Sequence, residues 1–273
     1  MSESHDDVVR REFTRQAPSF SRTDAYYASL AKGTLAALEP LAREDVVLEV
    51  ACGAAHASEA VAPRVQRVVG VDLTAALLAA GAARLAARRV DNVSLQEANA
   101  ARLPFASATF DLVFCRAAVH HFAEPELQVR EMVRVCRPGG RVVLLDMIAP
   151  NAALRTKFDA LHREIDPSHA SCLLEEELAA LLERCAGARA RALRSRSSPL
   201  SFEVFEHQSA TARPERLARV REELRSEALS GASATGFEPV LVEGALHVHL
   251  TSAVVSATLN PTPSPPLSRQ GSA

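Results

Sequence analysis

Short apolar runs alternate with longer helical patterns between residues 46 and 147. Five runs are apolar over most of their length, which is typical of parallel strands buried on both faces: VVLEVA, RVVGVDL, VSLQEA, FDLVFC and RVVLLDM. Between the last two runs, apolar residues follow the i, i+3, i+4, i+7 spacing of a helix that lies on a sheet: Val129, Met132, Val133 and Cys136. Strands and helices in this alternation predict a doubly wound α/β sheet, which binds its ligands at the carboxyl ends of the strands.

The pattern also predicts where elements begin and end. Thr74 can cap the helix that follows the second run, and RPGG (Arg137 to Gly140) is expected to end a helix before the fifth run. Residues 8–38 read as helix, and further helices are expected around Asn151–Glu164, Glu175–Cys185 and Pro214–Leu229. The runs RARALRSR and LHVHLTSAVVSATL resemble strands. We therefore expect an N-terminal helical lid (1–45), a core (46–150), the rest of the sheet with a substrate cap (151–259) and a disordered Pro/Ser-rich tail (260–273).

Composition narrows the class of protein. The 273 residues are 48% hydrophobic, enough for one large domain with a cap, and a net charge of -2 gives no reason to expect nucleic acid as a partner. The charged N-terminus lacks the apolar core of a signal peptide, and no apolar run reaches the ~18 residues that span a bilayer, so we expect a cytoplasmic monomer or homodimer without a membrane partner. Five scattered cysteines without a CxxC pair predict reduced core residues and no metal site.

The first predicted strand and the helix after it have the layout of a nucleotide-binding unit. The strand carries Glu49, a tight turn spans 51–55, and a helix starts near His56. The second strand ends in Asp72, about twenty residues beyond the turn, where a carboxylate can bind two ribose hydroxyls. The third strand leads into Asn99 and Ala100, in position to meet an adenine edge, and the fourth runs into CRAAVHHF.

The succession VLEVACG, VVGVDLT, ANAARLPFASATFDLVFCRAAVHHF and EMVRVCRPGGRVVLLD resembles class I S-adenosylmethionine (SAM) dependent methyltransferases. Within them it is similar to the ubiquinone/menaquinone C-methyltransferase branch, and FTRQAPSF near the N-terminus resembles the lead-in of that branch. The resemblance extends over residues 46–147. It implies a seven-stranded, mostly parallel, Rossmann-like sheet and SAM as the cofactor.

The same resemblance implies a set of cofactor-binding residues. Glu49 would lie near the methionine amino group, Gly53 would let the backbone approach the cofactor, and Asp72 would bind the ribose diol. The remaining positions would contact the adenine or the methionyl end, or form the turn itself: Ala51, Leu73, Asn99, Ala100 and Arg116.

Three positions depart from the family pattern. Ala51 and Ala55 stand where glycines are usual, and Asn99 stands where an aspartate is usual. A methyl group at a left-handed position costs on the order of 1 kcal/mol, and the change at position 55 is expected to matter more than the change at position 51. Asn99 keeps an amide oxygen that can accept from the adenine amine but lacks the charge. The sequence therefore predicts a weakened turn that still binds SAM.

The candidate catalytic residues are His120 and His121, just past the fourth strand, because a histidine is suited to remove a proton near neutral pH. In the alternative interpretation, one of the pair packs under the loop and fixes its shape. Asp146, at the end of the fifth run, can point to the acceptor or make an ordinary cap or salt bridge. Other histidines are more typical of packing, surface or strand positions than of a substrate or metal site: His162, His169, His207, His247 and His249. The arginines of GARARALRSRS are interpreted as a solvated strand face.

Residues 150–236 are too many for a simple connection within the sheet, so much of this length should form a lid over a small or medium organic molecule. The sequence thus predicts an enzyme, a SAM-dependent methyltransferase that acts on a secondary-metabolite or quinone-like phenol, acid or amine. Two alternatives stay open: a non-methylating reaction such as a cyclisation on the same fold, and a non-catalytic binding protein.

Overall fold

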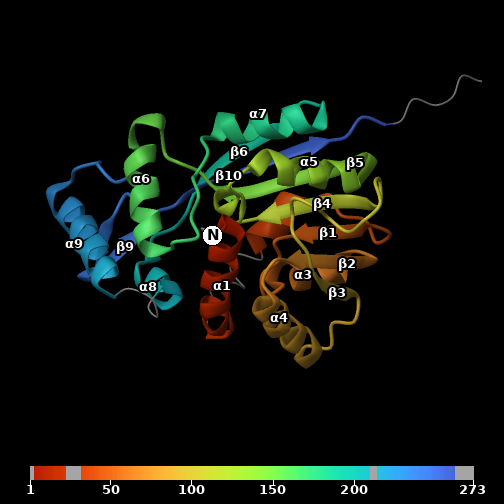
Figure 1. Ribbon diagram of the computed structural model, residues 1–273. Coiled ribbons are helices and arrows are strands. Elements are labelled where there is room, and N and C mark those ends of the chain that lie inside the picture. Colours follow the sequence, from red (N-terminus) through yellow and green to blue (C-terminus); the bar gives the residue numbers. More distant parts are fainter. Residues whose placement is uncertain (1–2, 23–31, 210–213, 262–273) are drawn as a thin grey trace, which may run out of the picture.

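The computed structural model describes residues 3–22, 32–209 and 214–261. Its main sheet has seven strands in the order β3-β2-β1-β4-β5-β10-β6 (Figure 1). Strands β1 to β5 are parallel, and β10 is antiparallel to both β5 and β6. The strands span Val46–Val50 (β1), Arg67–Asp72 (β2), Val93–Glu97 (β3), Phe110–Arg116 (β4), Cys136–Met147 (β5), Arg191–Arg196 (β6) and Thr251–Thr258 (β10). The predicted doubly wound, seven-stranded, mostly parallel sheet is confirmed.

Helices cover both faces of this sheet because successive side chains of a strand point to opposite faces. In β1, Leu48 and Val50 pack in one apolar cluster with α5 (Pro125–Val135) and α7 (Glu175–Ala186). Val47 packs in another cluster with α3 (His56–Val61) and the helical segment 32–38. A short 3-10 turn, η1 (Ala62–Arg64), follows α3, and α4 (Ala75–Ala87) packs against β2 and β3. Strands buried on both faces explain the nearly continuous apolar runs of the sequence.

A second, smaller unit lies beyond the carboxyl ends of the strands (Figure 1). Its three-stranded sheet, in the order β7-β9-β8, is surrounded by helices with which it shares an apolar core. The elements are α6 (Ala152–Ile165), β7 (Leu200–Ser201), α8 (Glu203–Ser209), α9 (Pro214–Ser230), β8 (Val240–Val242) and β9 (Ala245–Val248). Phe158, Phe202 and Phe237 are the large side chains buried at its centre. This unit is called the cap below.

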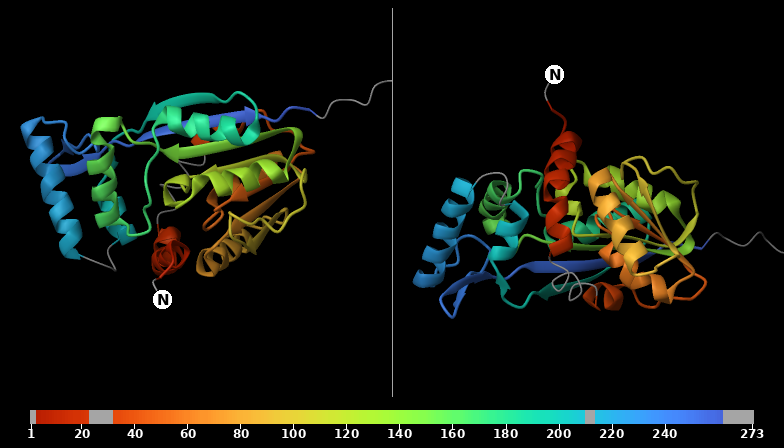
Figure 2. Two further views of the ribbon diagram at one scale, coloured as in Figure 1. Left: turned by 45° about the horizontal axis from the view of Figure 1, so that its top comes forward. Right: turned by 90° about the horizontal axis from the view of Figure 1, so that it is seen from below.

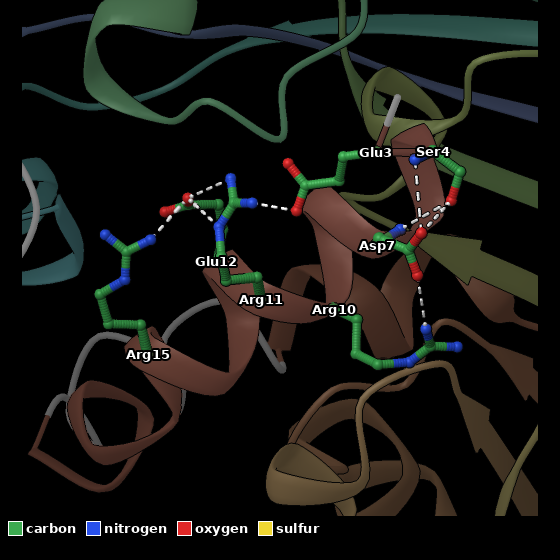
Figure 3. Close-up of polar contacts among 7 residues, drawn as sticks. All are labelled: Glu3, Ser4, Asp7, Arg10, Arg11, Glu12 and Arg15. Atoms are coloured by element: carbon green, nitrogen blue, oxygen red, sulfur yellow. Dashed lines mark hydrogen bonds and ion pairs between the residues drawn. The ribbon is translucent and has the colours of Figure 1, made fainter. Parts of the chain in front are cut away.

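Helix α1 (His5–Arg22) lies between the core and the cap (Figure 2), where it packs against α4 of the core and α8 of the cap. Its start is fixed by a reciprocal capping box, in which the Asp7 backbone N–H donates to Ser4 Oγ and the Ser4 N–H and hydroxyl donate to the Asp7 carboxylate (Figure 3). Arginines next along the helix pair with neighbouring acids, as Arg10 does with Asp7 and Arg15 with Glu12. One helix thus contacts both the core and the cap.

Two local expectations differ from the structure. RPGG does not separate helix from strand: α5 ends at Val135, and β5 already includes residues 137–140, where its register with β4 shifts. A Cβ on Gly140 would lie 2.8 Å from the Asp111 carbonyl oxygen, so glycine permits this close approach of the two strands. Thr74 stands at the N-cap of α4, but its hydroxyl makes no cap hydrogen bond; its backbone N–H instead donates to Asp72.

The other expected helices are present as α6, α7 and α9, and the late strand-like run is divided between β9 and β10. In the part of the chain that the structure describes, none of the helices combines the length and the apolar character needed to cross a bilayer. The expected disordered tail lies almost wholly outside the described residues, as do residues 23–31 of the expected N-terminal lid.

Candidate functional site

A cavity of about 760 Å³ opens at the carboxyl ends of the central strands, between the core, α1 and the cap. Its volume is in the usual range for a small-molecule site. All ten residues that the sequence predicts for the site line this one cavity: Glu49, Ala51, Gly53, Asp72, Leu73, Asn99, Ala100, Arg116, His120 and His121. They come from the ends of β1 to β4, which the parallel topology brings to the same edge of the sheet.

Asp72 holds the turn after β1 in place. One of its carboxylate oxygens accepts the Gly53 backbone N–H at 2.8 Å, and the other accepts the Thr74 N–H at 2.8 Å. Burial raises the pKa of Asp72, although these hydrogen bonds oppose the shift. Gly53 has a left-handed φ of 54°, and a Cβ there would meet nothing nearer than Leu77 at 3.9 Å. The backbone at Gly53 is therefore open to the close approach of a ligand.

Both alanines of the turn adopt left-handed backbone angles, with φ of 56° at Ala51 and 60° at Ala55. Such angles cost an L-residue with a Cβ roughly 1–2 kcal/mol, so the turn is strained at two positions. The two methyl groups are placed differently, because Ala51 lines the cavity whereas Ala55 is fully buried and is not part of the lining. Of the two departures, only Ala51 is part of the cavity wall, and we expect the departure at Ala55 to act through the strain of the turn.

Glu49 is a buried carboxylate on the wall of the cavity, with 3% of its surface exposed. The Ser58 hydroxyl of α3 donates to it. Burial raises the pKa of Glu49 to about 7, and the Ser58 hydrogen bond and the charge of Arg116 only partly offset this effect. A carboxylate in this environment gains from a cationic ligand, which would replace the lost hydration.

Asn99 has different partners from those expected. Its Oδ1 accepts the Ala101 backbone N–H at 2.8 Å, and its Nδ2 donates to Asp6 Oδ2 of α1 at 2.7 Å. The two partners fix the orientation of the amide, since Ala101 supplies a donor and Asp6 supplies an acceptor. The amide oxygen is thus engaged by the backbone, and a carboxylate from the N-terminal helix stands beside it.

His120 forms a two-point contact with Asp146 at the end of β5. Its Nδ1–H donates to Asp146 Oδ1 at 2.7 Å, and its backbone N–H donates to Asp146 Oδ2 at 2.8 Å. Burial opposes a charge on the ring, but the Asp146 carboxylate outweighs it and raises the pKa of His120. With Nδ1 occupied, Nε2 is the nitrogen left to take a proton, in a residue that lines the cavity.

Three further histidines extend this group into the cap. His121 Nδ1–H donates to the Ser168 carbonyl at 3.0 Å, His169 Nε2–H to Asp159 at 2.8 Å, and His162 Nδ1–H to the Phe158 carbonyl at 3.0 Å. Burial lowers the pKa of His121 to about 3 and also lowers the pKa values of His162 and His169, and the charge of His120 adds to this effect. Each ring is therefore neutral with its N–H used by the protein, and the second nitrogen of each is an acceptor.

His162 and His169, which the sequence interprets as packing residues, line the cavity with the two predicted catalytic histidines. His162 is 5% exposed, and its Nε2 is buried without a hydrogen-bond partner. A buried polar atom without a partner is unusual in a native fold. No local pattern in the sequence distinguishes this histidine, because its place in the cavity results from the packing of α6 against the loop at 168–172.

The remaining predicted residues lie elsewhere. His247 is on β9 and His249 just after it, where their Nδ1 atoms contact the carbonyls of Ala245 and Ser197. The side chain of His207 lies outside the described part. Every residue of β6 is exposed, as expected for a solvated strand face.

One cluster in the cap has the spacing of a metal site. Asp159, His169 and Cys172 each offer a ligand atom within 4.8 Å of the others. In this structure the Asp159 carboxylate accepts hydrogen bonds from the His169 ring, the Ser171 hydroxyl and the Cys172 backbone N–H. These contacts satisfy the carboxylate and hold the His169 ring in place.

Helix α1 connects both ends of the cavity. His5 Nε2–H donates to the His121 carbonyl at 2.8 Å, Asp6 pairs with Asn99, and Gln16 donates to Asp166 at 3.2 Å. The Phe13 ring stands edge-on to His121, with 5.0 Å between the ring centroids. The sequence predicts a helix over residues 8–38. It does not predict that Asp6 and Gln16 contact the site, because no local pattern distinguishes these two residues.

Comparison with known proteins shows which family part of the chain is similar to. Residues 48–144 match the family model described as a methyltransferase domain. The match is confined to this central part of the chain and does not extend to α1 or the cap. It includes most of β1, all of β2 to β4, most of β5 and all ten predicted site residues.

Relatives of this part of the chain carry corresponding names. The uncharacterized methyltransferase YcgJ of Bacillus subtilis is 38% identical over 127 residues, which are 46% of this chain and 50% of the relative. The demethylmenaquinone methyltransferase of Clavibacter sepedonicus is 33% identical over 136 residues, 50% of this chain and 54% of the relative. The chain therefore matches about half the length of these relatives.

Solved structures resemble more of the chain. The crystal structure of YcgJ from Bacillus subtilis has a TM-score of 0.73 and 25% identity, over 86% of this chain and 98% of that one. The [4+2]-cyclase SpnF has a TM-score of 0.59 at 17% identity, over 85% of this chain and 82% of that one, a likeness of fold alone.

Proposed function

We propose that this chain is a SAM-dependent methyltransferase that transfers a methyl group to a hydroxyl of a small organic acceptor, such as a phenol. The observation that carries the proposal is the pairing of two groups in one cavity. The buried carboxylates of Glu49 and Asp72 lie on the side formed by β1 and β2, and the His120–Asp146 pair lies at the ends of β4 and β5. The two carboxylates can bind a cationic nucleoside, and the His120–Asp146 pair can remove a proton from an acceptor.

The residues on the β1 and β2 side fit SAM. Asp72, with both oxygens fixed by backbone N–H groups, has lone pairs left for a ribose diol, and the open backbone at Gly53 accommodates close approach. The buried Glu49 carboxylate would bind the methionine ammonium, and Leu73 and Ala100 would contact the base. When bound, SAM supplies a methyl group that its sulfonium charge already activates, so the protein's own residues need chiefly to align the acceptor and exclude water.

On the histidine side, His120 acts as the base. An acceptor hydroxyl donates to Nε2, which takes the proton as the methyl group is transferred, and Asp146 stabilises the imidazolium that forms. Asp146 also fixes which nitrogen is free, since it holds Nδ1–H and the backbone N–H of the same residue. The catalytic role thus belongs to His120, whereas His121, with a pKa near 3, binds as a neutral acceptor.

The histidines favour a neutral hydroxylated acceptor over an acid. The second nitrogens of His121, His162 and His169 all present lone pairs, because their N–H groups bond to the protein. A hydroxyl can donate to such atoms, whereas a carboxylate has no proton to donate and would meet both these lone pairs and the Asp146 charge. Among the acceptors that the sequence allows, this argument favours a phenol over an acid.

Two other functions fit the same fold. A non-methylating reaction such as a cyclisation would use the acceptor end without transfer of the methyl group, and a binding protein would use neither end for chemistry. Neither alternative needs the His120–Asp146 contact, which is the feature that favours a proton-removing enzyme.

Calorimetric titration with SAM and S-adenosylhomocysteine tests the cofactor site. We expect both to bind, and at pH 6 to 7 we expect SAM binding to release protons, because the ammonium would ionise Glu49. The enthalpy would then depend on the ionisation enthalpy of the buffer in the wild type but much less in Glu49→Gln. Absence of binding at millimolar ligand would refute the proposal.

Incubation with radiolabelled SAM and a panel of phenols, carboxylic acids and amines tests the reaction. Label is expected in phenols, and His120→Ala should lower its rate of appearance far more than it lowers S-adenosylhomocysteine affinity. Binding without transfer to any member would favour a non-methylating or binding function, and an unchanged rate in His120→Ala would remove that residue from the mechanism.

A further inference from the structure

Position 99 lacks a carboxylate, but a carboxylate is present beside it. Asp6, in the first turn of α1, accepts the Asn99 Nδ2–H at 2.7 Å and lines the cavity. The two residues are 93 positions apart in the chain, so the contact depends on α1 lying across the strand ends.

The strand order shows which part of a nucleoside this pair would meet. β3 lies outside β2 in the sheet, and the Ala98 N–H donates to the Asp72 carbonyl at 3.0 Å. A ribose bound by Asp72 therefore places its base next to the residues that follow β3. Asn99 and Asp6 stand at this edge, with Leu73 and Ala100 in the same wall.

The hydrogen bonds decide which atom is available there. Asn99 Oδ1 is engaged by the Ala101 N–H, and Asn99 Nδ2 is engaged by Asp6 Oδ2. Within the described residues, the other oxygen of Asp6, Oδ1, has no hydrogen bond or ion pair, so it can accept a further donor. Adenine presents such a donor at its edge, the exocyclic amine, whereas a 6-oxo purine presents an acceptor at the same position.

We propose that Asp6 binds the exocyclic amine of the cofactor's adenine, a proposal that rests on the proposed function. Helix α1 then closes over the cavity as part of cofactor recognition. The chain thereby supplies from α1 the carboxylate that Asn99 lacks. The same helix contacts the His121 carbonyl through His5 and Asp166 through Gln16. Cofactor binding at one end therefore orders the helix that also covers the histidines.

The neighbouring Asp7 provides a matched control. It carries the same charge in the same turn, but it is exposed, pairs with Arg10 and Ser4, and is absent from the cavity lining (Figure 3). Asp6→Asn is expected to weaken S-adenosylhomocysteine about tenfold or more in calorimetry, because it removes a hydrogen bond to a charged group. Asp7→Asn should change this affinity less than threefold. Equal affinities in the two variants would overturn the proposal.

A charge exchange tests the pair itself. Asn99→Asp would bring two carboxylates together, and like charges at this distance repel, so α1 should open and affinity should fall. The double variant Asp6→Asn with Asn99→Asp restores one amide and one carboxylate and should recover most of the lost affinity. The proposal fails if Asn99→Asp binds S-adenosylhomocysteine as tightly as the wild type, with either Asp or Asn at position 6. This result would show that α1 takes no part in cofactor binding.

Two further readouts do not depend on activity. S-inosylhomocysteine, which has a 6-oxo purine, should bind the wild type at least tenfold more weakly than S-adenosylhomocysteine. In Asp6→Asn, the ratio of the two dissociation constants should be smaller. Hydrogen exchange of α1 should slow when S-adenosylhomocysteine is added to the wild type but not to Asp6→Asn. If the wild type binds neither nucleoside, the proposed function fails; if it binds both equally and α1 exchange is unchanged, only the role of Asp6 fails.

Discussion

The side chain and the backbone of His120 are held by the two oxygens of one carboxylate, that of Asp146. The Nδ1 contact is 2.7 Å and the backbone N–H contact is 2.8 Å. Asp146 is 4% exposed and His120 is 8% exposed, so the pair is nearly removed from water. The arrangement fixes the position, the tautomer and the basicity of the imidazole with a single group.

The pH dependence of methyl transfer should report this pair. His120 must be neutral to accept a proton, and its pKa lies above the ordinary 6.5, so kcat/KM should rise with pH and level off only above that raised value. Asp146→Asn removes the charge that raises the pKa, so the midpoint should move to lower pH and the plateau should fall. Asp159→Asn, which changes the partner of His169, is the control and should shift the midpoint less. A midpoint unaffected by Asp146→Asn would contradict the assignment.

The unfolding free energy of the protein should depend on pH because of Glu49. Its pKa is about 7 in the folded state and 4.5 ordinarily, so the folded state favours the protonated form. This contribution is complete below pH 4.5 and is lost as the pH rises through 7, which amounts to about 3 kcal/mol of unfolding free energy. Urea unfolding at pH 5 and pH 8 should therefore show a larger loss for the wild type than for Glu49→Gln. Equal losses would mean that the group is not desolvated.

The two strained alanines should respond differently to glycine. Ala51→Gly and Ala55→Gly each relieve a left-handed angle, and each should raise the unfolding free energy by up to about 1 kcal/mol. Only Ala51 lines the cavity, so Ala51→Gly should also bind S-adenosylhomocysteine more tightly, whereas Ala55→Gly should leave affinity nearly unchanged. Calorimetry and urea unfolding on both variants separate the effects. A large gain in affinity from Ala55→Gly alone would show that its methyl group, too, acts on the ligand.

Asp72 should matter for both the cofactor and the turn. Asp72→Asn replaces one acceptor oxygen that receives a backbone N–H, so S-adenosylhomocysteine affinity should fall by about 1–3 kcal/mol and the protein should lose stability. Glu97→Gln is the control, because Glu97 pairs in register with Asp72 on β3 but is exposed and outside the cavity. Calorimetry on the two variants checks this, and indistinguishable affinities would place the ribose elsewhere.

Several features of the site could be predicted from the sequence because they follow from topology. Parallel strands buried on both faces produce continuous apolar runs, and their carboxyl ends meet at one edge. Residues at the ends of such runs, including Glu49, Asp72 and Asn99, therefore had to lie near one another. The ends of helices and strands were less predictable, because the same residues can end a helix or belong to a strand. The inclusion of Arg137 to Gly140 in β5 is an example.

The hydrophobic period of the sequence by itself determined the doubly wound sheet, and the resemblance to a known family indicated the ten residues that line the cavity at its edge. Only the tertiary structure decided which atoms remain available there. The Asn99 amide faces Asp6, Ala51 rather than Ala55 meets the cavity, and His162 joins His120 from the cap. Each of these three contacts depends on the packing of segments that are far apart in the chain. A hydrogen bond between such segments does not change the hydrophobic period of either segment, so the sequence pattern does not predict it.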